Sequence, residues 1–312
     1  MKKVVIIRAA GNELANQLWN YASIYAYCRE RKYVLENPAF FEYGEYFTIP
    51  APSFFTKLFF FLPFKNYTKR KTALRRRIWR KLYARYTDFI ISRHQDDLMS
   101  SVNKDNIPCY LPPTKESAGM LKELEQRSGD IYFDGWLSRN PVGLEQYHGE
   151  ILKFFEPRAD IKQKIDATMK DLHARYEHIV GVHIRQGDYQ TWRDGAYFIN
   201  QKRVRVILNE YLSFSKKEPN EVCFLITSDG PIDKDTFSSG LNIVVSNSNA
   251  VADLFLLAST DVVIGSNSTF GAFAAYYGNI PFIVMQEEVI DWDYYQGKTG
   301  FFENKYSTMV HY

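Results

Sequence analysis

The sequence predicts an α/β protein built on parallel β-sheets, and two patterns lead to this fold class. The chain opens with a β-branched run, Lys2–Arg8, which a polar loop and a helical stretch follow. After Pro157, short apolar runs alternate regularly with helical segments. Such alternation is typical of parallel strands covered by helices on both faces. With 312 residues, 46% of them hydrophobic, the chain can form two domains, each with its own core.

The opening strand leads into a helix predicted over Leu14–Lys32. One face of this helix gathers apolar side chains, namely Leu14, Leu18, Tyr21, Tyr25 and Cys28. Periodicity is poorer from residue 36 to about 130, and we interpret residues 43–130 as a basic and aromatic insertion. Strand character resumes over Ile131–Trp136, and a helix over Leu144–Phe155 ends before Pro157. We therefore place the domain boundary between residues 157 and 158.

The second half alternates element by element. Helices are predicted over 159–176, 202–215, 250–260 and 268–278, and strands over 178–185, 222–229, 242–246, 261–266 and 281–285.

Composition excludes several classes of protein. A net charge of +3 is too small to indicate nucleic-acid binding. Cys28, Cys109 and Cys223 are far apart and indicate buried thiols in a reducing compartment rather than disulfides or zinc. The run Ser53–Phe64 is shorter than the ~20 residues that span a bilayer, and the N-terminus does not continue as a signal peptide. The aromatic content of 16% fits sugar-binding surfaces, but more simply a core.

A basic segment, 72–90, needs its own explanation. It fits a helix with Leu74, Ile78, Leu82, Tyr86 and Ile90 on one stripe and six Lys or Arg residues elsewhere, with Trp79 near the apolar edge. One interpretation is a helix lying on an anionic membrane, with the aromatic run 58–64 in the same interface. The other, which we slightly favour, is that the stripe packs on the N-terminal domain and the charges are solvated.

Polar residues follow three consecutive strands of the second half. Val180–Trp192 reads VGVHIRQGDYQTW, and the two-residue period places His183 and Arg185 on one side of the strand. Arginine offers a planar fork suited to phosphate oxygens, although an ion pair between Arg185 and Asp188 explains the same residues.

The other two strand ends allow similar pairs of interpretations. The turn 266–269 starts a helix, so Ser268 and Thr269 form either an anion site or an ordinary N-cap. Asp229, after ITSDG, accepts hydrogen bonds from a base or ribose, or else caps a turn. Because such strand ends line one crevice of one parallel sheet, their convergence favours a ligand site.

Motifs for other ligands are missing from the sequence. There is no G-x-G-x-x-G after the first strand, no Walker A motif and no D-x-D pair for a divalent metal. We therefore expect no metal and no cofactor, with diphosphate charge neutralised by Arg, hydroxyls and a helix dipole.

At these residues the chain resembles the alpha-1,2-fucosyltransferases of glycosyltransferase family 11. HIRQGDY is similar to the family's H-x-R-R-G-D-Y, and NELANQLWNYA (Asn12–Ala22) to its G-G-L-G-N-Q-M-F-Q-Y-A. FDGWLSRNPVGLEQY, ITSDG and DLFLLASTDVVIGSNSTFGAFAAYYG resemble three further motifs in the same order. Residues from about 43 to 130 lie outside the resemblance.

The resemblance implies a GT-B-like fold with two Rossmann-like domains facing a cleft: residues 1–157 on the acceptor side and 158–312 binding GDP-fucose. It implies inversion of the anomeric centre without a metal. In this chain Arg185 would contact the β-phosphate and His183 would hold the nucleotide. Ser268 and Thr269 would cradle the diphosphate, with Asn267 beside them and Phe270 beneath. Asp229 would shape the nucleotide pocket, and Asn16 and Gln17 would face the cleft.

Some positions depart from the family. The position of the family's second arginine is occupied by Gln186 in this chain. Either a phosphate-neutralising charge is lost or this position is peripheral to the site. Its glycines before Asn-Gln are Asn12, Glu13 and Ala15, so that loop has another backbone. Where the family has two tryptophans, this chain has Ala272 and Phe273, so we expect its acceptor, and even its sugar, to be open to difference from the family's.

The expected reaction is transfer of fucose from GDP-fucose to a glycan hydroxyl, in alpha-1,2 linkage. Glu13 is the first candidate for the base and Asp188 the second, and a weak base with catalysis mostly by leaving-group departure is a third option. Transfer of another GDP-sugar and a non-catalytic sugar- or nucleotide-binding protein remain alternatives. We expect a cytoplasmic protein that is either free or peripheral on the inner face of the membrane. Under the second interpretation, its glycan acceptor would be carried on a membrane lipid.

Overall fold

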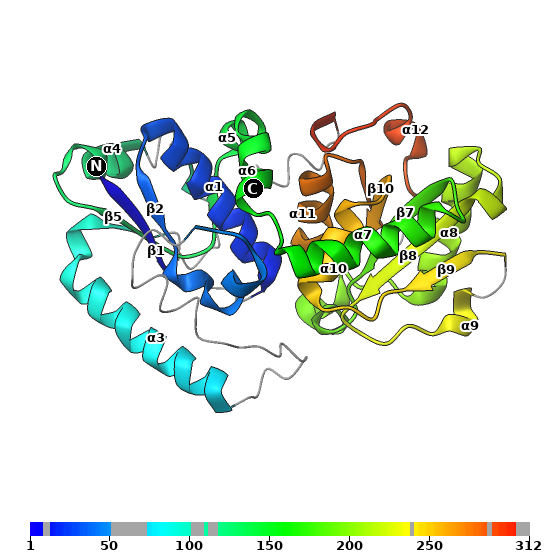
Figure 1. Ribbon diagram of the computed structural model, residues 1–312, viewed down its shortest axis with the longest axis horizontal. Coiled ribbons are helices and arrows are strands. Elements are labelled where there is room, and N and C mark those ends of the chain that lie inside the picture. The colour runs from blue at the N-terminus through cyan, green and yellow to red at the C-terminus, as the bar shows by residue number, and fades with distance from the viewer. Residues whose placement is uncertain are drawn as a thin grey trace. The chain divides into compact units, whose positions relative to one another are not determined.

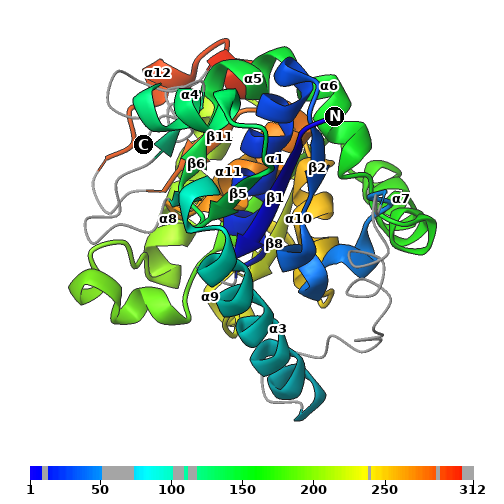
Figure 2. The same cartoon turned by 90° about the vertical axis from the view of Figure 1, so that its left-hand side faces the viewer.

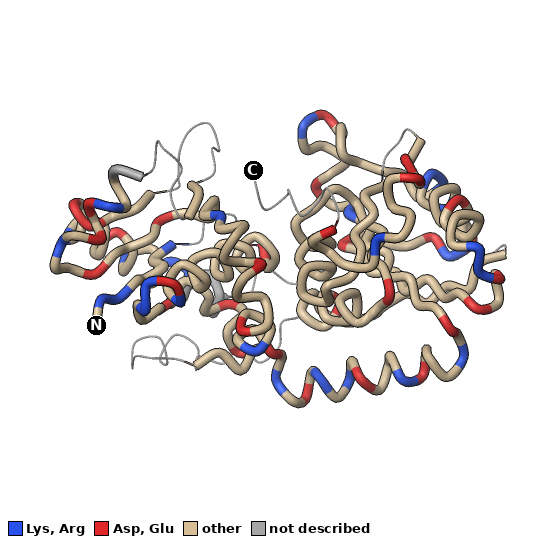
Figure 3. The backbone as a smooth tube through the Cα atoms, turned by 90° about the horizontal axis from the view of Figure 1, so that it is seen from above, with Lys and Arg blue, Asp and Glu red and all other residues tan. Residues whose placement is uncertain are grey.

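The computed structural model describes residues 1–8, 13–50, 74–100, 109–111, 118–237, 240–285 and 289–303; for 74–77, 79, 118 and 119 it describes the backbone alone. The chain divides into two compact units, Met1–Arg158 and Ala159–Met309, next to the expected boundary. Basic and acidic residues are intermixed along both units (Figure 3). Across the described ranges, no helix combines the length and apolar character needed to cross a bilayer.

The first unit contains a four-stranded parallel sheet in the order β2-β1-β5-β3. Its strands are β1 (Lys3–Arg8), β2 (Val34–Glu36), β3 (Leu98–Ser100) and β5 (Ile131–Asp134). Strand β1 runs between β2 and β5 (Figures 1 and 2). Val4, Ile6 and Ile7 are fully buried, as the β-branched run predicts.

Helix α1 (Leu14–Arg31) follows β1 and is more deeply buried than predicted. Leu14, Leu18, Tyr21 and Cys28 are buried, but so are the polar residues Gln17, Asn20 and Ser23. Asn20 accepts a hydrogen bond from the Ser138 amide at 3.1 Å, which compensates its burial. The prediction of one buried face was too narrow, because further elements cover the helix. They are α5 (Pro141–Gln146) and strand β6 (Ser138–Arg139), which pairs with β4 (Cys109–Tyr110) in a short two-stranded sheet.

Aromatic side chains of the first unit pack together near the start of the insertion. The 3-10 helices η1 (Pro38–Glu42) and η2 (Gly44–Tyr46) precede the undescribed residues 51–73, and α3 (Leu74–Arg93), η3 (Gln95–Asp97) and α4 (Ala118–Gln126) come later. Tyr21, Phe40, Phe47 and Phe155, the last just after α6 (His148–Phe154), form a buried cluster with ring centroids 5.2 to 6.1 Å apart. These aromatic residues therefore serve the core.

Helix α3 is present as predicted, but its buried side differs from the predicted stripe. Tyr83 and Thr87 are buried, whereas Ile78 and Leu82 are about half exposed. The reason is that the Tyr83 hydroxyl donates to the carbonyl of Ile7 in β1, and Thr87 Oγ1 lies against the same oxygen while it donates to the Tyr83 carbonyl. The stripe therefore does not pack as a whole on the first unit. The aromatic run 58–64, and the side chains of Leu74 and Trp79, lie outside the described residues.

The second unit is a five-stranded parallel sheet in the order β11-β10-β7-β8-β9. The strands are β7 (His178–Ile184), β8 (Val222–Ser228), β9 (Asn242–Val245), β10 (Val262–Gly265) and β11 (Phe282–Val284). The helices are α7 (Ala159–His173), α8 (Gln201–Ser215), α9 (Lys234–Phe237), α10 (Ala250–Ala258), α11 (Thr269–Gly278) and α12 (Trp292–Tyr295). The predicted alternation is confirmed: most elements are one to three residues shorter than predicted, and α8 begins one residue earlier.

The two faces of β7 meet different helices. Val180, Val182 and Ile184 pack into a core with side chains of α8. The alternate positions face the other way: a Cβ on Gly181 would touch α10, and His183 lies against α11. Figure 1 shows α10 and α11 on one face of the sheet and α8 on the other. Strand β7 therefore directs His183 toward the start of α11.

Candidate functional site

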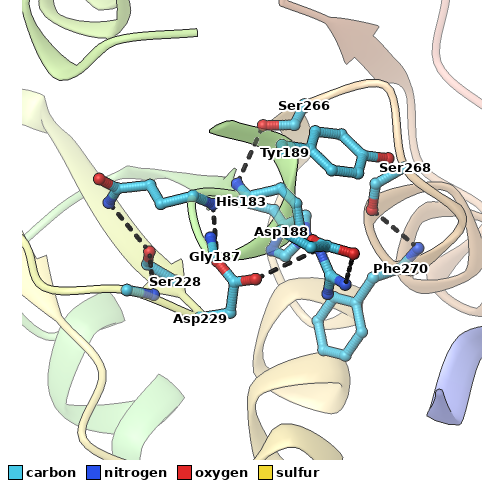
Figure 4. Close-up of polar contacts among 12 residues, drawn as sticks. His183, Gly187, Asp188, Tyr189, Ser228, Asp229, Ser266, Ser268 and Phe270 are labelled. Carbon is cyan, nitrogen blue, oxygen red and sulfur yellow. Dashed lines mark hydrogen bonds and ion pairs between the residues drawn. The ribbon is translucent and has the colours of Figure 1, made fainter. Parts of the chain in front are cut away.

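The site residues lie where three neighbouring parallel strands end. Arg185 follows β7, Asp229 follows β8 and Ser266 follows β10, and β7 pairs with both other strands. Because parallel strands end at the same edge of a sheet, these residues meet in space. Figure 4 shows Asp229 and Ser266 at this edge. The Arg185 amide donates to Ser266 Oγ at 3.0 Å, and the Ser266 amide to the His183 carbonyl at 2.9 Å.

Arg185 is fixed by two carboxylates. Its Nε and Nη2 donate to the two oxygens of Asp188 at 2.8 and 3.1 Å, and Nε lies 3.2 Å from Asp229 Oδ2. The guanidinium carbon also lies 5.6 Å from the ring centroid of Tyr189. The ion pair foreseen as the alternative role of Asp188 is thus present. It engages the Nε–Nη2 edge of the guanidinium, and the side chain remains 20% exposed.

Asp229 holds the loop that carries Arg185. Its Oδ1 accepts hydrogen bonds from the amides of Gln186 at 2.6 Å and Gly187 at 3.1 Å. A Cβ at Gly187 would lie 3.0 Å from Asp229 Oδ2, so glycine permits this close approach. The contacts fix the backbone after β7 to the end of β8.

Gln186, the position of the family's second arginine, is buried in a network of its own. Its Nε2 donates to Ser228 Oγ at 3.2 Å and to the Pro231 carbonyl at 3.1 Å. Its Oε1 accepts from Gln201 at 2.9 Å. Gln186 thus ties the loop to β8 and α8. All the side-chain hydrogen bonds described for Gln186 belong to this structural network.

His183 is buried and incompletely paired. Its Nδ1 lies 3.4 Å from Thr227 Oγ1, and its ring centroid lies 4.7 Å from that of Phe270. Burial, together with the nearby positive charge of Arg185, lowers the pKa of His183 to about 4. The imidazole is therefore neutral near pH 7. Its Nε2 is a buried polar atom with no hydrogen-bond partner among the described residues, an arrangement that costs free energy unless a ligand completes it.

Helix α11 begins beside this histidine. Ser268 is its N-cap and accepts from the Phe270 amide at 3.1 Å, so the expected cap is present; Thr269 is the first helical residue. The Asn267 carbonyl accepts from the Tyr189 hydroxyl at 2.8 Å. A helix N-terminus favours anions, and here the unpaired nitrogen of His183 lies next to it.

Two residues of the site were not foreseen. Tyr189 joins Arg185 to the loop before α11, and Ser266 anchors the Arg185 amide. Ser266 directly follows a buried strand, the same signal that identified Asp229. Tyr189 belongs to the HIRQGDY motif, but its role became visible only from its contacts with Arg185 and the Asn267 carbonyl, which depend on the fold.

The remaining predicted site residues belong to the first unit. Glu13 is the N-cap residue of α1 but makes no side-chain cap hydrogen bond. Asn16 and Gln17 lie in the first turns of the same helix. Gln17 is buried, and its Oε1 has no partner in the described part of the chain. The structure thus brings these three residues to one helix end.

No cluster of three or more His, Cys, Asp or Glu residues suited to a metal occurs among the described residues. The three cysteines are free and buried, as expected for thiols outside disulfides. Around Arg185 the described residues thus gather one guanidinium, the carboxylates of Asp188 and Asp229, and the hydroxyls of Ser266 and Ser268 near the start of α11.

A family model matches part of the chain. Residues 139–291 match the model of glycosyl transferase family 11, and they include all three strand ends. No curated protein sequence matches the chain.

Similar solved structures include a mutant of Arabidopsis thaliana FUT1 in complex with GDP, with 13% identity and a TM-score of 0.53 over 92% of this chain and 72% of that one. Fucosyltransferase NodZ from Bradyrhizobium has 16% identity and a TM-score of 0.55 over 93% and 97%. NodZ alpha-1,6-fucosyltransferase soaked with GDP-fucose has 16% identity and a TM-score of 0.51 over 90% and 94%. These likenesses confirm the predicted GT-B-like fold class.

Proposed function

We propose that the protein transfers fucose from GDP-fucose to a hydroxyl group of a glycan acceptor, because residues 139–291 match the model of glycosyl transferase family 11. The proposal rests on one overlap: the family match covers the strand ends that form the Arg185 site. Structures of similar fold were solved with GDP or after soaking with GDP-fucose, which supports a GDP-sugar as donor.

The donor diphosphate is proposed to bind at Arg185 and the start of α11. Arg185 supplies a positive charge and Ser268 and Thr269 supply hydroxyl and amide groups at the positive end of a helix. We propose that His183 Nε2, which has no partner among the described residues, forms a hydrogen bond with the nucleotide while the imidazole packs against the Phe270 ring. Asp229 contributes by fixing the loop, since its Oδ1 holds two of the loop amides.

In the proposed reaction, an acceptor hydroxyl oxygen forms a bond to the anomeric carbon of fucose. The bond from that carbon to the diphosphate oxygen breaks, and GDP leaves with the electron pair. In-line attack inverts the anomeric centre, and alpha-1,2 is the proposed linkage. Arg185 and the α11 N-terminus stabilise the charge that develops on the leaving diphosphate, so no metal is needed. A base takes the hydroxyl proton.

Glu13 remains the proposed base, with Asp188 second. Asp188 is engaged by Arg185 through both of its oxygens, which favours its service as an ion-pair partner. Glu13→Gln should lower kcat more than it raises KM for the donor, because it removes the base and keeps the shape of the side chain. Asp188→Asn is the matched comparison. An unchanged kcat in Glu13→Gln would remove it from the mechanism.

A donor screen tests the proposed function. The protein is incubated with GDP-fucose, GDP-mannose or UDP-sugars, with and without glycan acceptors, and nucleotide release is measured. We expect GDP release from GDP-fucose that rises with acceptor, and NMR of the product gives the anomer and linkage. Release from GDP-mannose alone would mean another sugar. Donor binding without release in any combination would indicate a non-catalytic binding protein.

A further inference from the structure

Among the described residues, the hydrogen bonds and ion pair that anchor helix α3 to the first unit lie along one side of the helix. The Tyr83 hydroxyl donates to the Ile7 carbonyl at 2.6 Å, and Thr87 Oγ1 lies 3.4 Å from the same oxygen while it donates to the Tyr83 carbonyl at 2.9 Å. Arg80 pairs with both carboxylate oxygens of Glu42 at 2.6 and 3.1 Å. These contacts leave the opposite side of the helix facing outward.

The outward side carries a stripe of large apolar side chains. Ile78, Leu82 and Phe89 are 47%, 46% and 53% exposed. They are spaced by four and seven residues, which places them on one face of an α-helix. Single exposed apolar residues are ordinary, but three on one helix face mark an interaction surface.

Basic residues flank this stripe. Lys81, Arg85 and Arg93 are exposed, and the Arg93 guanidinium lies 5.0 Å from the centroid of the Phe89 ring. Along residues 74–93 the sequence has seven Lys or Arg and one acid, Asp88, a net charge of +6. We name the apolar stripe and these flanking cations the α3 face: Ile78, Lys81, Leu82, Arg85, Phe89 and Arg93.

We propose that the α3 face binds the surface of a membrane that contains anionic phospholipids. Ile78, Leu82 and Phe89 enter the interface between headgroups and acyl chains, and the flanking cations contact lipid phosphates. Figures 1 and 2 show α3 at the margin of the first unit, along one side of its sheet.

A membrane fits this surface better than other partners do. A nucleic acid would use the charges but has no place for three exposed apolar side chains along the helix. A second copy of the chain would bring two helices of charge +6 together, which costs free energy at short range. A bilayer takes up both the apolar stripe and the charges, and it needs no matching groove because it deforms around a convex helix.

The test is co-sedimentation of the full chain with vesicles of phosphatidylcholine alone or mixed with phosphatidylserine, at low and high salt. We expect binding to the mixed vesicles only, weakened by salt. Lys81→Glu with Arg85→Glu should reduce binding at least about tenfold, because it replaces two charges that attract lipid phosphates with two that repel them. Ile78→Ser with Leu82→Ser and Phe89→Ser should reduce binding at both salt concentrations.

Matched controls carry the same chemical changes elsewhere. Lys164→Glu with Lys170→Glu makes the same charge change on the exposed side of α7, and Val206→Ser removes an exposed apolar side chain from α8. Both should bind vesicles as the wild type does, and all variants should release GDP from the donor at unchanged rates. Equal recovery in the supernatant with and without vesicles would overturn the proposal. So would equal loss of binding in the α7 control, or binding to an oligonucleotide but not to vesicles.

Discussion

Arginine side chains occur in two contrasting settings in this molecule. In the loop after β7, Arg185 is held by Asp188, Asp229 and the ring of Tyr189. On the α3 face, Arg85 and Arg93 extend from a helix without an ion pair to any described residue. A guanidinium held in one orientation by carboxylates suits a small anion of defined shape, whereas exposed cations without a carboxylate partner among the described residues suit a diffuse anionic surface. Positive charge alone therefore does not indicate the partner, and we infer that its restraint by neighbouring carboxylates is the more useful guide.

The largest effect should follow from breaking the restrained setting. Arg185→Ala should reduce turnover at least about 100-fold, because it removes a charge-assisted contact to the departing diphosphate worth on the order of 3 kcal/mol. Arg185→Lys should also be severely impaired, since lysine keeps the charge but loses the fork. Turnover and thermal melts are measured together. Near-normal turnover in the alanine variant would remove Arg185 from the donor site, and a collapsed melt would assign it a purely structural role.

His183 gives the next largest effect, seen in the pH dependence of stability. Burial and the charge of Arg185 lower its pKa to about 4 in the folded protein, against 6.5 for an exposed histidine. The unfolded chain therefore binds a proton first as pH falls. Its contribution to the free energy of unfolding is complete above pH ~6.5 and is lost between that pH and about 4, by up to about 3 kcal/mol.

Chemical denaturation at pH 7 and pH 5 compares wild type with His183→Asn, which does not titrate. The variant should lose less stability between the two pH values. Parallel losses in both proteins would show that His183 is not protonated more readily in the unfolded chain.

A smaller effect is expected when the family's second arginine is restored. Gln186→Arg would put a charge into the buried network of Ser228, Pro231 and Gln201. It should lower stability by about 1–3 kcal/mol and bring no gain in GDP affinity, because the side chain serves the loop rather than the anion. Isothermal titration with GDP and a thermal melt measure both quantities. Tighter GDP binding with an unchanged melt would mean that this position does face the ligand.

The smallest expected effect is that of a chelator. Transfer should proceed at the same rate in excess EDTA, since the proposed leaving-group stabilisation uses Arg185 and the start of α11. Rates are compared before and after chelation, with added Mg²⁺ or Mn²⁺ as a control. A loss restored by the metal would contradict the metal-independent mechanism.

The second unit was predictable because its signals are local. Buried parallel strands read as continuous apolar runs, and the polar residues at their ends follow directly in the sequence, as with Arg185 and Asp229. What could not be predicted depends on contacts between distant residues. Asn20 is buried because its partner is the amide of Ser138, 118 residues away. The stripe on α3 was assigned by spacing, but the burial of Tyr83 is decided by a carbonyl in β1, 76 residues away.

The restraint of Arg185 also has an entropic consequence. An arginine side chain carries about 2 kcal/mol of rotamer entropy, which is lost when the side chain is immobilised. Because Asp188, Asp229 and Tyr189 already hold the guanidinium, most of this loss occurs when the protein folds. An anion that reaches Arg185 then meets a group with little orientational freedom left to lose, so more of the contact energy remains as affinity.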